Sequence, residues 1–295
     1  MFFTNATIYR IVSAIPANIE DALQAASFTP CGDTQESSSG WVPPRGAEHG
    51  ALAESVDGNT ILKLMMESKS IPTSVIKRKV DEQLTRIEAE TGRKPGKKEK
   101  RELAEDAKLA LLPMAFTKQS ACLVWIDSRT GCLWIDTASS TTADAVLSAL
   151  VRGIEGLVLQ PLNTQSSASA CMSQWLLAQE PPSNFSVDRE CELKASDESK
   201  AVVRYKNHAL DIDEVVDHIT HGKVPTRLAM THASRVSFLL SDNLTLRKIT
   251  VLDIPDANDN HKDAFDADVA IGTAELRVLW TSLVDALGGE VDTAE

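Results

Sequence analysis

The residues best suited to chemistry form a basic cluster between positions 93 and 101. The stretch reads Arg-Lys-Pro-Gly-Lys-Lys-Glu-Lys-Arg, so six of its nine residues are basic and one is acidic. Clustered lysine and arginine side chains bind phosphate, which is the basis of sequence-independent nucleic-acid binding. The whole chain has a formal net charge of −12, however, and a negative field opposes the approach of nucleic acid. The two facts are compatible if positive charge gathers on one inner surface and negative charge is spread outside.

Two expected helices position this cluster. Between 72 and 90, apolar residues recur at steps of three and four, and Pro72 suits the first turn of a helix. A second helix is expected over roughly 97–112, ended by Pro113, with glycine and proline breaking the chain between the two. Positions 77–108 hold eleven basic and eight acidic residues. The local charge is therefore +3, and the rest of the chain carries −15.

Eight basic side chains on or beside these helices are candidate contacts with nucleic-acid phosphate: Lys77, Arg78, Arg93, Lys94, Lys97, Lys98, Lys100 and Arg101. The alternative is a solvated helix face held by salt bridges, because glutamates lie among the basic residues at helical spacing. Arg93 and Lys94 fall in the turn between the helices, and for them the alternative to phosphate contact is that they are simply mobile. The residue pattern by itself leaves both interpretations open.

Several catalytic and metal-binding patterns are absent from the sequence. There is no G-x-x-x-x-G-K-[ST], no G-x-S-x-G and no H-E-x-x-H. The five cysteines form no C-x-x-C pair and are odd in number, which argues against a disulfide framework and against a zinc ribbon. We expect buried, reduced thiols at Cys31, Cys122, Cys132, Cys171 and Cys191.

Three groups of residues contain potential metal ligands. His218 and His221 stand three residues apart on an expected helix, but no third ligand is near in sequence, which favours a surface or capping role. Residues 256–261 resemble the start of a calcium loop, yet His261 stands where the sharp turn needs glycine. A solvated acidic face is also the more common role of the C-terminal aspartates, although they could bind magnesium in a nuclease: Asp253, Asp256, Asp259, Asp263, Asp266 and Asp268. No metal or cofactor is predicted.

The remaining segments alternate irregularly between strand and helix patterns. Strands are expected over 5–13, 60–67, 121–127, 132–137, 157–162, 191–194, 201–206, 226–231, 236–240, 247–252 and 265–272. Further helices are expected over 18–27, 142–154, 172–179, 212–220 and 274–287. Residues 28–44 read as a turn and a Ser-rich loop.

This arrangement predicts the α+β class, with mixed or antiparallel sheets around the central basic helices. The expected parts of one interlocked chain are 1–70, 71–120, 121–180 and 181–295. The first residues read as a strand rather than a signal peptide, and no apolar run approaches the ~18–20 residues of a membrane span. Four tryptophans lie in apolar stretches, which predicts core positions rather than base-stacking platforms: Trp41, Trp125, Trp134 and Trp175.

Four segments, taken in order, resemble one known family. They are Phe28-Thr-Pro-Cys-Gly32, Gly40-Trp-Val-Pro-Pro44, Leu111-Leu-Pro-Met-Ala-Phe116 and Ala286-Leu-Gly-Gly-Glu290. Together with Trp125-Ile-Asp127 and the basic helical pair between them, the chain resembles the bacterial recombination-associated RdgC family. The likeness covers nearly the whole chain, and its weight lies in the joint order and spacing of the segments.

The resemblance implies a homodimer closed into a ring around duplex DNA. It further implies sequence-independent binding, with single-stranded DNA bound more weakly, and no enzymatic activity. A cytoplasmic, nucleoid-associated protein that restrains the RecA recombinase and takes part in recombination and replication-fork restart is the expected role. A ring could line its hole with positive charge and keep a negative outer wall, since a cavity focuses the local field.

The resemblance also adds candidate residues. Phe116 lies near a subunit contact of the family, with ordinary core packing as the alternative, and Lys118 is a candidate DNA contact. Arg204 and Lys206 fall where relatives carry a more basic protruding loop. His208 departs from that pattern and puts the strength of the loop's grip on DNA in doubt. Two other functions stay open from the residues: a metal-dependent nuclease, and a protein-interaction module with an incidental basic helix.

Overall fold

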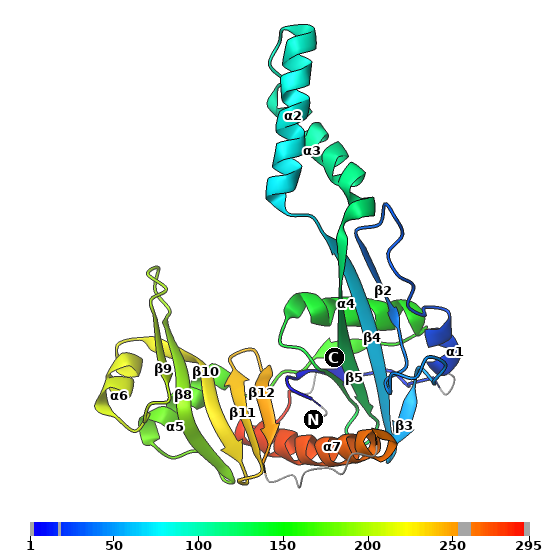
Figure 1. Cartoon of the computed structure of the whole chain (residues 1–295). Coiled ribbons are helices and arrows are strands. Elements are labelled where there is room, and N and C mark those ends of the chain that lie inside the picture. The colour runs from blue at the N-terminus through cyan, green and yellow to red at the C-terminus, as the bar shows by residue number, and fades with distance from the viewer. Residues whose placement is uncertain (1–2, 17–18, 253–260, 292–295) are drawn as a thin grey trace.

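The computed structural model describes residues 3–16, 19–252 and 261–291. It shows two antiparallel sheets and seven α-helices in these residues, which confirms the expected α+β class with antiparallel sheets. A long C-terminal helix runs along the base of both sheets (Figure 1). Two projections, a helical arm and a β-hairpin, rise from this base on the same side of the molecule (Figure 1).

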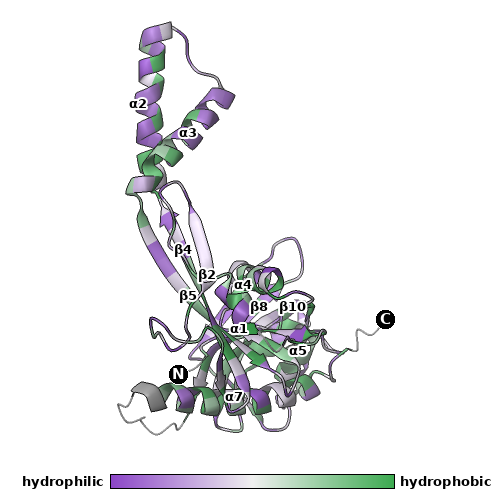
Figure 2. Cartoon of the chain, turned by 90° about the vertical axis from the view of Figure 1, so that its right-hand side faces the viewer, coloured by the Kyte–Doolittle hydropathy of each residue, from purple (hydrophilic) through white to green (hydrophobic). Residues whose placement is uncertain are grey.

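The first sheet has the strand order β2-β4-β5-β6-β1-β7, and β3 pairs with β4 at one end. Its strands are β1 (Thr7–Ile11), β2 (Ser37–Trp41), β3 (Glu54–Val56), β4 (Asn59–Ser70), β5 (Phe116–Asp127), β6 (Cys132–Ile135) and β7 (Leu159–Pro161). Strands β4 and β5 stay paired from Thr60 and Ile126 to Ser70 and Phe116. Their far halves extend beyond the core as a ribbon that carries the helical arm (Figure 2).

Each face of this sheet packs against helices. On one face, α1 (Ile19–Gln24) and α4 (Ser140–Gly153) cover Trp41, Leu64 and Val124. On the other face, the rings of Trp125 and Trp134 stack at 4.8 Å. Trp41, Trp125, Trp134 and Trp175 are all buried, which confirms the prediction that they belong to the core.

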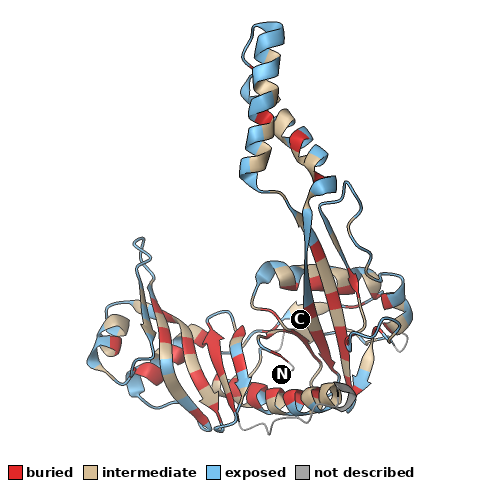
Figure 3. Ribbon diagram, in the orientation of Figure 1, coloured by how far each residue is buried: buried red, intermediate tan, exposed pale blue. Residues whose placement is uncertain are grey.

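The second sheet has the order β12-β11-β10-β8-β9. Its strands are β8 (Phe185–Ala195), β9 (Val202–Lys206), β10 (Lys223–His232), β11 (Val236–Ser241) and β12 (Leu246–Val251), and its helices are α5 (Ala168–Ala178) and α6 (Asp213–Thr220). A bridge between Ala6 and Leu246 joins it to the chain before β1. The core of this sheet is continuous with the Trp125 face of the first sheet (Figure 3).

Helix α7 (His261–Ala286) corrects one expectation, because the strand expected over 265–272 lies inside it. Its buried residues Val269, Leu276, Leu279 and Leu283 recur at helical spacing. Residues 265–272 alone are too few to show the helical period.

An ion pair fixes α7 to the first sheet. The Arg277 guanidinium donates to both carboxylate oxygens of Asp127, at 2.9 and 3.0 Å, and to Asn59 Oδ1 at 2.7 Å. Burial raises the pKa of a carboxyl, yet the Arg277 bonds bring the pKa of Asp127 below its ordinary value.

Residues 37–41 correct a second expectation, because the Ser-rich loop continues into the edge strand β2. The segment before β2 returns against it, and Phe28 N–H donates to the Trp41 carbonyl at 3.0 Å. A Cβ atom on Gly40 would lie 2.4 Å from the Phe28 Cα atom. Glycine is therefore required at this close approach of two backbones.

The helical arm consists of α2 (Thr73–Thr91) and α3 (Lys97–Leu111), which confirms both expected helices. Gly92 ends α2 with a left-handed φ of 66° and donates its N–H to the Glu88 carbonyl. A 3₁₀ turn, η1 (Leu112–Met114), leads from α3 into β5. None of the helices in the described residues combines the length and apolarity that a membrane span requires.

Candidate nucleic-acid interface

The arm stands clear of both hydrophobic cores. Its buried apolar side chains are few, namely Val80, Pro95, Ala107 and Leu112, and none of them belongs to either core of the body. Most of its surface is exposed (Figure 3) and hydrophilic along the helices (Figure 2). Its basic residues are therefore accessible over much of the length of both helices.

Half of the eight candidate residues of the arm form ion pairs. Arg93 binds Glu99 through two hydrogen bonds of 2.8 and 3.0 Å. The remaining pairs are Lys94 with Glu88 at 3.6 Å, Lys98 with Glu102 at 3.9 Å, and Arg101 with Glu105 at 3.2 Å. The bond to Arg93 lowers the pKa of Glu99, and the same bond raises the pKa of Arg93.

The other four, Lys77, Arg78, Lys97 and Lys100, have no ion pair within the described part of the chain. The arm is thus partly the salt-bridged face that the sequence left open as an alternative. Exposed pairs of this kind contribute only about 0.2–1 kcal/mol each, so a phosphate group can replace the carboxylate at small cost. The ion pairs therefore do not remove these side chains as candidates.

Lys77 and Arg78 lie on the face of α2 turned away from the α2–α3 seam. Asp81 and Glu82 share this open face with them. The charge here is mixed, in contrast to the tip of the arm, where six basic residues occur within nine positions. The tip is the more strongly positive part of the arm.

Lys118 lies on the exposed ribbon below the arm, directly opposite Ser68 of β4, which itself pairs with Ser37 of β2. Directly paired residues share one face of a sheet, so the two hydroxyl groups and the lysine lie in a row across three strands, with the lysine at one end. The sequence analysis missed these serines, although hydroxyl groups are ordinary donors to phosphate. The alternation of Ser68 and Ser70 at the end of β4 was the available signal, whereas the run of serines at 37–39 shows no such period.

Phe116 is 89% exposed, and Met114 nearby is 72% exposed. The alternative that Phe116 is an ordinary core residue is therefore wrong. Leu109, near the end of α3, is also 50% exposed, so three exposed apolar side chains lie close in sequence where α3 leads into β5. The role of Phe116 as a subunit contact stays a prediction, and its exposed apolar side chain is available for such a contact.

Arg204 and Lys206 lie on β9, in the hairpin that forms the second projection. Arg204 Nε donates to Glu192 Oε2 at 2.6 Å, across the hairpin. Lys206 is exposed and stands opposite Glu190. The turn at the end of the hairpin carries two acidic residues and one lysine. The structure thus places these two candidates apart from the arm, among acidic neighbours (Figure 1).

The described residues contain no group of three or more side chains able to hold a metal ion. His218 Nδ1 lies 3.1 Å from Lys223 Nζ, and His221 Nδ1 bonds the Asp217 carbonyl at 2.6 Å. Asp266 binds Arg45, while Asp253, Asp256 and Asp259 lie outside the described residues, as does the side chain of Asp263.

All five cysteines are free thiols, and four of them are buried, whereas Cys31 is half-buried. Burial raises the pKa of Cys122 and of Cys191 to about 12. These two thiols are therefore poor nucleophiles at neutral pH. Four of the five cysteines are therefore buried free thiols as expected, whereas Cys31 is a free thiol that is partly exposed.

The sequence was compared with known families and proteins. The family model described as "Putative exonuclease, RdgC" matches residues 1–290. The recombination-associated protein RdgC of Bordetella pertussis is 40% identical, and the alignment covers 98% of this chain and 99% of the relative. The protein of the same name from Dechloromonas aromatica is 36% identical with both chains fully covered. The chain belongs to the RdgC family.

The resemblance read from the sequence is thereby confirmed. The RdgC relatives carry the name of a recombination-associated protein. The description of the RdgC family model adds an exonuclease, which neither supports nor contradicts the expectation that the protein has no enzymatic activity.

Proposed function

We propose that this protein is a non-enzymatic, sequence-independent DNA-binding protein that encircles duplex DNA as a homodimeric ring. The observation that carries the proposal is the exposed arm, whose segment 77–108 has a charge of +3 in a chain of −12. Because the arm has few buried side chains, its exposure cannot be explained by a packing role in this chain. An accessible positive projection suits contact with phosphate.

The shape of the chain supports the ring. The arm and the β8–β9 hairpin rise on the same side of the α7 base, so one chain forms an open, curved body (Figure 1). A second copy that meets the first at the exposed patch of Phe116, Met114 and Leu109 would close it. Basic side chains would then face the hole, and the rest of the chain, with its charge of −15, would form the outer wall. The electric field inside the hole, rather than the net charge of the protein, would then decide whether DNA is attracted.

The basic side chains provide phosphate contacts and no base reading. Lys77, Arg78, Lys97 and Lys100 carry free charge, and Lys98 and Arg101 would exchange their carboxylates for phosphate. Contacts with the backbone fix a protein on the duplex but carry no sequence information. Duplex DNA, with two charged strands, is the preferred form, and single-stranded DNA is bound more weakly.

Restraint of RecA follows from occupancy of the same DNA. A ring on duplex DNA would exclude RecA from the segment it covers, without any need for direct contact. The protein would act in the cytoplasm at the nucleoid, in recombination and in replication-fork restart. This part of the proposal rests on the family resemblance and on the relatives' names.

Retention on circular DNA tests the ring. The protein is bound to a nicked circular plasmid and to the same plasmid linearised, and both complexes are washed in high salt. We expect the circle to retain the protein and the linear form to lose it, because a closed ring can leave only over an end. A monomeric mass in solution with and without DNA, or equal loss from both forms, would contradict the ring.

Substitution of Phe116 tests how the ring closes. Phe116→Glu places a charge in the exposed apolar patch, so we expect the mass in solution to fall toward that of a monomer. Val278→Glu is the matched control, since Val278 is 58% exposed on α7, away from this patch. If Phe116→Glu leaves the dimer intact, the subunits meet elsewhere.

A metal-dependent exonuclease is the second candidate, favoured by the printed description of the family model. End-labelled duplex and single-stranded DNA are incubated with the protein and either Mg²⁺ or Mn²⁺ for several hours. Intact label supports the non-enzymatic proposal. Progressive shortening from one end that is abolished by EDTA would replace it with the nuclease.

A further inference from the structure

Strand β8 leaves half of its outer edge without a neighbouring strand. Strand β9 pairs with β8 only from Glu190 to Lys194, whereas β10 pairs with β8 along nearly its whole length on the other side. The last bond on the β9 side runs from His208 N–H to the Arg189 carbonyl, at 3.2 Å. Beyond it, no strand in the described chain covers residues 185–188.

The alternation of hydrogen bonds shows which backbone groups face this edge. The Asn184 carbonyl accepts from Ala233 N–H on the β10 side, at 2.7 Å. In an antiparallel ladder the direction alternates, so the groups of Phe185 and Val187 point to the open side. Phe185 N–H already donates to the Pro182 carbonyl. The Phe185 carbonyl and the N–H and carbonyl of Val187 are therefore left to pair with the backbone of a new strand.

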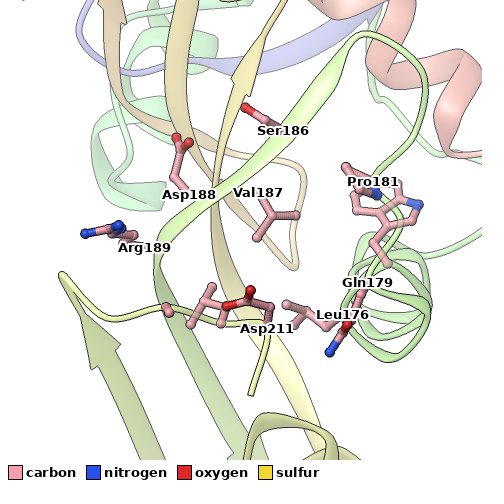
Figure 4. A pocket seen from close by; sticks show the side chains of 11 residues that line it. Leu176, Gln179, Pro181, Ser186, Val187, Asp188, Arg189 and Asp211 are labelled. Carbon is pink, nitrogen blue, oxygen red and sulfur yellow. The ribbon is translucent and has the colours of Figure 1, made fainter. Parts of the chain in front are cut away.

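A cavity of about 450 Å³ lies beside this edge, between β8, the end of α5 and residues 209–211. Trp175, Leu176, Val187 and Leu210 provide its apolar lining. The Val187 side chain points toward Leu176 and Asp211, whereas Ser186 and Asp188 point to the other face of the strand (Figure 4). The volume falls in the range of about 300–1,000 Å³ that is usual for ligand sites.

The charge around the cavity is mainly negative. Asp211 lines it together with one basic residue, Arg189. The Asp188 side chain lies on the opposite face of β8 (Figure 4), where it accepts a hydrogen bond from Thr231 Oγ1 at 2.8 Å. Asp213 and Glu214, in the first turn of α6, follow Asp211 closely in the chain. A basic ligand is therefore favoured over an acidic one.

We propose that this site binds an extended, basic peptide segment of a partner protein by strand addition to β8. The peptide backbone would pair with Val187, and one bulky apolar side chain would enter the cavity. The flanking lysine or arginine residues, which point to the opposite face of the added strand, would face Asp188. An open strand edge next to an apolar pocket combines affinity through the backbone with selection of a side chain. The site lies outside the arm and does not depend on DNA binding.

The probe is the fluorescein-labelled peptide acetyl-Thr-Lys-Leu-Lys-Thr-amide, titrated with the full chain and followed by fluorescence anisotropy. We expect saturable binding and slower hydrogen exchange of the Val187 amide. N-methylation of the leucine nitrogen removes one backbone donor and keeps the side chain, so it should weaken binding at least about tenfold. Replacing both lysines with glutamate should weaken it similarly. Equal binding of the N-methylated peptide, or no saturation at millimolar protein, overturns strand addition.

A filled cavity is the matched test in the protein. Ala209→Trp places a large side chain at the exposed rim, and it should weaken peptide binding at least about tenfold. Ala201→Trp, at an exposed position of the β8–β9 hairpin, is the control and should leave binding unchanged. Thermal unfolding of both variants at the wild-type temperature shows that the fold is intact. Unchanged binding by Ala209→Trp would place the peptide elsewhere and refute the site.

Discussion

The two projections of this molecule differ in how they carry charge. The arm combines eleven basic and eight acidic residues between 77 and 108. Of its eight candidate phosphate contacts, four have no ion pair in the described chain. In the β8–β9 hairpin, Arg204 is held by Glu192, and Lys206 stands opposite Glu190. Both rise from the same base (Figure 1). Glu190 binds Lys248, so Lys206 also has no ion pair in the described chain, and the hairpin has one unpaired candidate where the arm has four.

This difference separates a main contact from an auxiliary one. Surface ion pairs within α3 join neighbours along one helix, so they can break without moving the backbone. Glu192, by contrast, is largely buried at its side chain and also binds Arg227 and Thr226. Arg204 therefore loses more when it leaves its partner, and the arm should provide most of the binding to phosphate.

The largest effect is expected from the tip of the arm. Replacing Lys97, Lys98, Lys100 and Arg101 by alanine removes four positive charges. Each neutralised phosphate contributes about 0.9 to the slope of log K against log salt, so the slope should fall by up to about 3.6. We expect equal losses for unrelated duplex sequences, measured by anisotropy across a salt series.

Two measurements control this experiment. The mass in solution must stay that of the parent, because the substitutions lie outside the Phe116 patch. Helix content by circular dichroism must also be retained, and alanine favours it. An unchanged slope in a folded dimer would show that the tip of the arm does not contact DNA.

The comparison also shows how far the sequence could predict the structure. Both arm helices were expected because glycine and proline punctuate a long apolar period at Gly92, Pro95 and Gly96. The pairs Lys98–Glu102 and Arg101–Glu105 follow from helical spacing, whereas Arg93–Glu99 depends on how the chain turns between the helices.

Other features depend on tertiary structure and were missed or left undecided. The run from Leu111 to Phe116 is apolar, and apolarity does not distinguish a core residue from an exposed contact. Phe265 to Gly272 fits a strand over eight residues, but it belongs to a helix whose period appears only over its full length. The open edge of β8 was also invisible, because strand length does not reveal where a neighbouring strand ends.

A matched pair of double variants compares the two projections directly. Arg204→Ala/Lys206→Ala and Lys97→Ala/Lys100→Ala each remove two positive charges. We expect the arm pair to lower the salt slope by about 1.8 and the hairpin pair by less than about 0.9. If the hairpin pair costs as much as the arm pair, the ion pair of Arg204 with Glu192 does not hold its charge back from DNA, and the contrast between the projections fails.

The smallest expected effect is a gain. Glu105→Gln removes the partner of Arg101 and raises the charge of segment 77–108 from +3 to +4, while glutamine and glutamate have similar helix propensity. If Arg101 must leave Glu105 to bind phosphate, the variant avoids that cost, which is about 0.2–1 kcal/mol for an exposed pair. Duplex affinity should then rise about 1.4-fold to fivefold. Glu155→Gln, an exposed residue of the body, changes the net charge equally and should raise affinity less. Equal gains from both variants would mean that only the overall charge matters and that Arg101 is already free of its partner in the bound state.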